Sequence, residues 1–201
     1  TILKVAGERF ARIPVAAGCG GSMASRPVHN IRDYLEERLP NQDSTCLPES
    51  ELPPCDGRHG IDFLLDELKG DVVPVTIGAM TNLAAAIVKD WRVTRRIPRI
   101  VCMAGEFRRP MAEWNIRCDP EAAHIVFSSG IPMDVIPFEI GMQATFVPAE
   151  VARLAGSDRP LAKRLSMAIA AWQKTHGENA ASAMPHLFDP MAIATMIRPE
   201  L

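Results

Sequence analysis

The sequence predicts an α/β fold, with a mostly parallel β-sheet covered by helices on both faces. Two observations support this prediction. Short apolar runs alternate along the chain with longer segments of helical pattern, which is the rhythm of consecutive βα units. Each apolar run also has a glycine at or near its end, where a strand turns into the next loop.

The predicted strands share this apolar pattern with a closing glycine, and they occupy residues 11–18, 71–80, 97–106 and 132–141. The predicted helices show apolar residues at helical spacing, and they occupy residues 61–69, 81–91, 119–129 and 160–175. The helix near residue 119 has the clearest boundaries. Asp119 is a favoured N-cap, Pro120 suits the first helical position, and Gly130 is placed to end the helix.

Residues 19–58 interrupt this rhythm. They are rich in Pro, Ser, Asp and Gly, and a short helix is predicted only at 30–39. A stretch of that length within a compact domain is more often a functional loop or lid than a linker. We therefore expect residues 1–201 to form a single α/β domain, or the central part of one, with a loop or lid at 19–58.

The composition excludes several classes of function. A hydrophobic fraction of 47% with 23% charged residues is ordinary for a globular protein, and the net charge of -2 gives no reason to expect a nucleic acid or an anionic membrane as partner. The apolar runs are too short to span a bilayer. The 5 cysteines are scattered without CxxC spacing, which favours reduced thiols in a cytoplasmic protein and indicates no zinc site.

Polar side chains follow the predicted strands. In an open parallel sheet, ligands bind outside the carboxyl ends of the strands, so the segments GCGG, IGAMTN, AGEFRRPMAEWN and EIGMQ are expected to line one rim. Glu113 and Asn115 lie on that rim and point the same way if the chain is extended there. A solvated loop carboxylate and an Asx-turn asparagine explain this pair equally well, so both interpretations stay open.

Three segments, VPVTIGAMTNLAAAI, AEWNIRCDPEAAHIVFSSG and LFDPMAIA, resemble hallmark segments of the inosine-uridine-preferring nucleoside hydrolases, in the family's order. RIPVAAGCGG and DGRHGIDFL are weaker matches in the correct order. The resemblance implies a calcium-dependent enzyme with a Rossmann-like sheet, of which this chain is a part. Such an enzyme cleaves the N-glycosidic bond of ribonucleosides to ribose and free base, in purine or pyrimidine salvage. A small nucleoside or ribosyl substrate, calcium and a homo-oligomer are therefore expected.

The resemblance also implies roles for individual residues. Asp189 corresponds to a calcium ligand, and the backbone carbonyl of Ile77 corresponds to a second one. Glu113 and Asn115 correspond to the pair that hydrogen-bonds the ribose hydroxyls. His59, in RHG, corresponds to a histidine near the substrate.

The sequence departs from the family pattern at two places that concern catalysis. Phe188 stands where a histidine often serves the leaving group; it can stack on a base but cannot donate a proton. The family's early cluster of aspartates, which includes the general base, has no match here, so we expect it in a segment before Thr1 and assign no catalytic residue. The 201-residue chain alone is then expected to bind calcium weakly and to be inactive. A non-catalytic nucleoside- or ribose-binding relative, or a fragment without an intact site, is the alternative.

Overall fold

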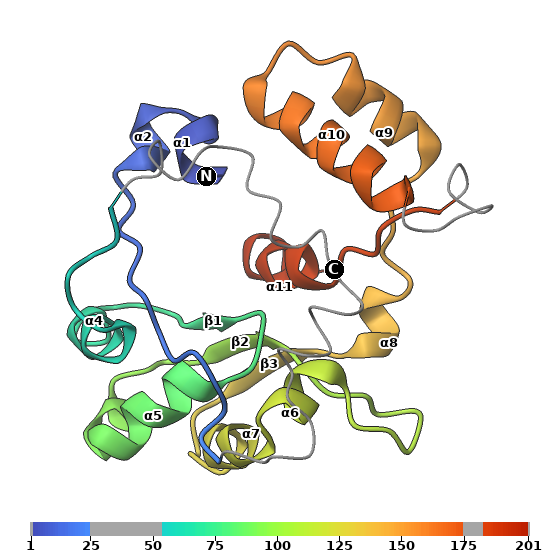
Figure 1. Cartoon of the computed structure of the whole chain (residues 1–201). Coiled ribbons are helices and arrows are strands. Elements are labelled where there is room, and N and C mark those ends of the chain that lie inside the picture. Colours follow the sequence, from blue (N-terminus) through green and yellow to red (C-terminus); the bar gives the residue numbers. More distant parts are fainter. Residues whose placement is uncertain (1, 25–53, 175–182, 201) are drawn as a thin grey trace. The chain divides into compact units, whose positions relative to one another are not determined.

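The computed structural model describes residues 2–24, 54–174 and 183–200, which belong to two compact units (Figure 1). In its described part, the first unit contains residues 2–15, 54–56, 145–174 and 183–186, and the second contains residues 16–24, 57–144 and 187–200. The helix predicted at 30–39, and most of the loop or lid predicted at 19–58, lie outside the described residues. The extent of the domain therefore stays a prediction.

The second unit is built on a three-stranded parallel sheet in the order β1–β2–β3. Its strands are β1 (Val75–Thr76), β2 (Ile100–Met103) and β3 (Met133–Ile136). In the register of the sheet, Cys102 lies opposite Thr76 on one side and opposite Val135 on the other. These strands lie inside the predicted ranges 71–80, 97–106 and 132–141, so the predicted α/β class and the parallel pairing are confirmed.

Helices cover both faces of this sheet. On one face, α4 (Gly60–Glu67), α5 (Thr81–Lys89) and α7 (Pro120–Phe127) contribute to a core that includes Ile100 and Cys102. On the other face, α11 (Phe188–Ile197) brings Ala192 against Val101 and Ile136. Figure 1 shows α11 on one side of the strands, with α5 and α7 on the opposite side. All four residues of β2 are buried, as expected for a strand covered from both sides.

The remaining elements of the second unit are short: a 3-10 helix η2 (Trp91–Arg95), α6 (Trp114–Cys118) and α8 (Phe138–Gly141). The first unit contains α1 (Ile2–Ala6), α2 (Glu8–Ala11), α9 (Pro148–Ala155) and α10 (Pro160–Lys174). The helices predicted at 61–69, 81–91, 119–129 and 160–175 are thus present as α4, α5, α7 and α10. In the part of the chain that the structure describes, no helix is both long enough and apolar enough to cross a membrane.

The strand predicted at residues 11–18 is wrong. Helix α2 ends at Ala11, and the residues that follow join no described strand; Ile13 and Val15 are 49% and 47% exposed. The reason lies in the hydrogen bonds of this segment. The carbonyl of Val15 accepts from the N–H of Asp56, and the carbonyl of Ala17 accepts from the N–H of Gly60, the first residue of α4. A short bridge and a helix terminus therefore take the place of a neighbouring strand. An apolar run predicts burial, but a strand also needs a partner for its backbone.

Candidate functional site

The carboxyl end of β2 leads into a region with buried polar side chains, among them Glu113 and Asn115. Gly105 follows this strand with φ of 82°, a left-handed conformation that favours glycine. Its N–H donates to Glu113 Oε2 at 3.2 Å, and its carbonyl accepts from the N–H of Phe138 at 2.9 Å. Gly105 therefore connects the end of β2 to the start of α6 and to the start of α8.

Glu113 is the N-cap of α6, and its side chain is almost fully enclosed. Besides the N–H of Gly105, its carboxylate accepts from the N–H of Asn115 at 2.8 Å and from the N–H of Ile116 at 3.3 Å. Only 3% of Glu113 is exposed, so the interpretation as a solvated loop carboxylate is wrong. The free N–H groups of a helix start stabilise a negative charge at this position.

Asn115 is fixed just as firmly, in the first turn of α6. Its Nδ2 donates to the carbonyl of Met103 at 3.0 Å, so the side chain satisfies the last carbonyl of β2. This is a bond to a neighbouring strand, not the local turn that the alternative interpretation required. Glu113 and Asn115 are therefore held in place before any ligand binds, which is the condition for precise recognition.

Asp189 lies in the first turn of α11, on the opposite face of the sheet from α5. Partial burial raises the pKa of its carboxyl group, and the negative charge of Glu113 raises the same pKa further. Two carboxylates that are distant in the chain therefore interact electrostatically in the folded protein. A cation bound nearby would relieve that repulsion.

Two other predicted site residues, Ile77 and His59, come from different elements. Ile77 follows β1 directly, and its side chain is 49% exposed. His59 is the N-cap of α4, where its Nδ1 accepts from the N–H of Ile61 at 3.2 Å. In the described part of the chain, hydrogen bonds join Glu113 to Asn115 but do not link His59 to that pair.

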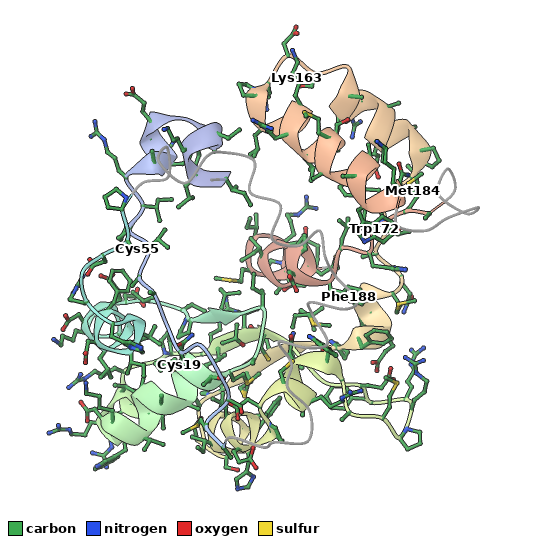
Figure 2. The ribbon with its side chains drawn as sticks, in the orientation of Figure 1. Cys19, Cys55, Lys163, Trp172, Met184 and Phe188 are labelled. Atoms are coloured by element: carbon green, nitrogen blue, oxygen red, sulfur yellow. The ribbon has the colours of Figure 1, made fainter. Side chains whose placement is uncertain are left out.

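Phe188 packs against α8. Its ring stacks on the ring of Phe138, with 5.3 Å between the centroids and 19° between the planes. Figure 2 labels Phe188 at the start of α11, on the side that faces α8. Phe138 was not predicted as a neighbour of the site, because residues 132–141 were expected to form one strand. Pro137, which ends β3 and precedes α8, was the available signal for a boundary there.

A second buried carboxylate anchors the segment that contains GCGG. Asp119 is the N-cap of α7 as predicted, accepting from the N–H of Ala122 at 3.0 Å. It also accepts from the hydroxyl of Thr81 at 2.6 Å and from the N–H of Met23 at 2.8 Å. Near the other end of the segment, the N–H of Cys19 donates to the Asn82 side chain. Side chains of α5 and the cap of α7 thus hold residues 19–24.

The oxygen atoms at this edge of the sheet are of the kind that a hard cation prefers. They include the Asp189 carboxylate, which the negative charge of Glu113 repels, and the backbone carbonyls that follow the strands. Among residues 2–24, 54–174 and 183–200, however, no group of three or more His, Cys, Asp or Glu residues is arranged to hold a metal ion.

Comparison with known proteins covers the whole chain. Residues 1–201 match the family described as inosine-uridine preferring nucleoside hydrolase. A Schizosaccharomyces pombe protein of uncharacterised function is 32% identical over 204 residues, covering 94% of this chain and 63% of that protein. The pyrimidine-specific ribonucleoside hydrolase RihB of Escherichia coli is 30% identical over 149 residues, covering 71% of this chain and 48% of that protein.

Solved structures agree with this comparison. A plant nucleoside hydrolase, the PpNRh1 enzyme, matches with a TM-score of 0.77 and 26% identity, over 94% of this chain and 61% of that one. A purine-preferring ribonucleoside hydrolase from Gardnerella vaginalis matches with a TM-score of 0.74 and 26% identity, over 94% of this chain and 62% of that one. The chain spans 48% to 63% of the length of these four relatives.

Proposed function

Because the chain belongs to the inosine-uridine preferring nucleoside hydrolase family, we propose that it takes part in hydrolysing the N-glycosidic bond of ribonucleosides. The products are ribose and the free base. The observation that carries this proposal is the buried pair Glu113 and Asn115, held by backbone groups at the carboxyl end of β2. A charged side chain kept inside a protein beside a second carboxylate favours a role in binding or catalysis.

The chemistry of the substrate fits this pair. Ribose offers two neighbouring hydroxyl groups, which donate to a carboxylate such as that of Glu113 and accept from or donate to an amide such as that of Asn115. Cleavage of the glycosidic bond develops positive charge on the sugar ring, as in an oxocarbenium ion. Carboxylates preorganised around the ring stabilise that charge more in the transition state than in the ground state.

We infer that calcium is the cofactor, held by Asp189 and the backbone carbonyl of Ile77. When bound, calcium supplies a positive charge that orients the ribose hydroxyls and makes nearby water more acidic. The repulsion between Glu113 and Asp189 supports a cation at this place. Calcium takes about six to eight oxygen ligands, so two ligands from this chain leave the shell incomplete.

We assign the leaving base to Phe188 and keep His59 as a further substrate-binding residue. A phenylalanine ring binds a base by stacking and transfers no proton, so the group that protonates the base stays unassigned, as does the general base. We also propose a cytoplasmic homo-oligomer acting in purine or pyrimidine salvage. The alternative is a nucleoside- or ribose-binding protein without catalysis. Phe188 supports it too, because its ring can bind a base but cannot protonate it.

Calorimetric titration with calcium and a reducing-sugar assay on inosine and uridine test the proposal. We expect the 201-residue chain alone to bind calcium weakly and to release no ribose. A longer form of the protein that supplies further carboxylates should bind calcium tightly and release ribose from at least one of the two substrates. Tight binding of a nucleoside by that longer form without any release of ribose would favour the binding protein instead. Tight calcium binding by the 201-residue chain would show that the metal ligands are assigned wrongly.

A further inference from the structure

The ring of Phe188 lies where a side chain on Gly141 would otherwise be. A Cβ atom added at Gly141 would lie 2.0 Å from Cδ1 and 2.7 Å from Cε1 of Phe188, whereas ordinary van der Waals contact begins at 3.4 Å. Gly141 is buried at the end of α8. The glycine is therefore required for space, and any other residue would push the ring by more than 1 Å.

Phe138, at the other end of α8, holds the same ring from a second side. It stacks on Phe188 and also lies under the guanidinium group of Arg109, whose Cζ is 5.1 Å from its ring centroid. Arg109 is held in turn by Glu106, with Nη2 2.6 Å from Oε2. A column of four side chains, Glu106, Arg109, Phe138 and Phe188, therefore joins the loop after β2 to the start of α11.

The backbone on both sides of this column is also fixed. The N–H of Phe138 donates to the carbonyl of Gly105, and the N–H of Leu187 donates to the carbonyl of Ala144 at 2.8 Å. Phe188 lies between Leu187 and Asp189, so its backbone is fixed at the start of α11. The position of the ring is determined by α8 and not by its own helix alone.

We propose that Gly141 and Phe138 are positioning residues that hold Phe188 as the stacking surface for the leaving base, and that they set the preference between purine and pyrimidine nucleosides. This inference rests on the proposed function. A two-ring base covers more of a phenylalanine ring than a one-ring base does, so its binding depends more on where that ring lies. A misplacement of about 1 Å caused by a mutation away from the reacting atoms can cost about 100-fold in rate.

The test is Gly141→Ala in a form of the protein that hydrolyses nucleosides, with kcat/KM measured for inosine and for uridine. We expect kcat/KM to fall about 100-fold for inosine and about 10-fold or less for uridine. The ratio of the two values is the informative quantity, because a loss of folded protein lowers both equally. Gly156→Ala is the matched control: its Cβ would lie 3.5 Å from the nearest atom, the Ala152 carbonyl oxygen, so the ratio should not change.

A second arm uses Phe188→Ala, alone and combined with Gly141→Ala, with the thermal midpoint as readout. Removing the ring removes the overlap, so Gly141→Ala should lower Tm in the parent but not in the Phe188→Ala background. An inosine-to-uridine ratio that changes less than twofold in Gly141→Ala, with the parent active, overturns this inference and leaves the proposed function standing. A parent protein that releases no ribose overturns the proposed function, and the assignment of base preference with it, whatever the Tm values show.

Discussion

The two ends of α6 each carry a buried carboxylate that accepts three hydrogen bonds, yet the donors come from different parts of the chain. Asp119, at the end of α6, receives its donors from Met23, Thr81 and Ala122, so it joins the segment 19–24 to α5 and α7. Glu113, at the start, receives its donors from backbone groups close by in the chain.

The charged surroundings of the two carboxylates also differ. The charge of Glu113 raises the pKa of Asp189, which means that the fold keeps two negative groups near each other at an electrostatic cost. Asp119 instead ties three parts of the structure together and is wholly buried. The comparison teaches that burial and hydrogen bonding alone do not distinguish a structural carboxylate from a functional one. The proposed difference in role rests on the neighbouring carboxylate of Asp189.

The largest effect is expected from Asp189→Asn, in a form of the protein that hydrolyses nucleosides. The substitution removes the charge that would hold calcium, so activity should fall about 1,000-fold or more, because metal and activated water are lost together. Calorimetry should show calcium affinity falling in parallel. If activity stays within tenfold of the parent, Asp189 is not a ligand of a metal that catalysis requires.

Glu113→Gln should have the next largest effect. An amide keeps the shape of the side chain but neutralises the group that would stabilise positive charge on the sugar, so kcat should fall about 100-fold. Because one acceptor oxygen becomes a donor facing an N–H, stability should also fall, by about 1–2 kcal/mol in urea unfolding. A variant that loses stability but keeps the parent kcat would make Glu113 a purely structural cap like Asp119.

Asp119→Asn should show the reverse pattern. An amide cannot accept all three of the hydrogen bonds that Asp119 accepts, so the free energy of unfolding should fall by about 2–3 kcal/mol. The rate per folded molecule should stay within about threefold of the parent, because this side chain joins elements and touches no substrate. Paired urea unfolding and active-site titration separate the two quantities. A loss of kcat without a loss of stability would show that Asp119, like Glu113, has a role in catalysis or binding.

The smallest effect concerns Cys102, which lies in β2 and is affected by the charge of Glu113. Burial, followed by the charges of Asp134 and Glu113, raises the pKa of this thiol to about 12 from an ordinary value of 9.0. At pH 8 its thiolate fraction is then about 0.01%, against about 10% for an ordinary thiol. A thiol reagent should therefore modify the exposed Cys55 and leave Cys102 intact until the protein unfolds. Modification of Cys102 as fast as Cys55 would show that this region is open to water.

Local signals in the sequence predicted a good part of the fold. The N-cap at Asp119 could be predicted from the neighbouring residues Asp-Pro-Glu, because the cap bonds to an N–H only three positions away. The three strands inside 71–80, 97–106 and 132–141 were predicted because each lies in an apolar run with a glycine at or near its end. The run at 11–18 has the same composition, but the prediction was wrong because its backbone partners are Asp56 and the start of α4, which no local pattern reveals.

The candidate site divides in the same way. The sequence by itself determined the family, the α/β class and the residue types at the rim, because these depend on patterns that neighbouring residues carry. The tertiary structure alone decided that Glu113 is buried rather than solvated, that its charge acts on Asp189, and that Phe188 rests on Phe138 in the space left by Gly141. Those facts depend on distances between groups that are remote in the chain, and such distances are fixed only when the helices pack on the sheet.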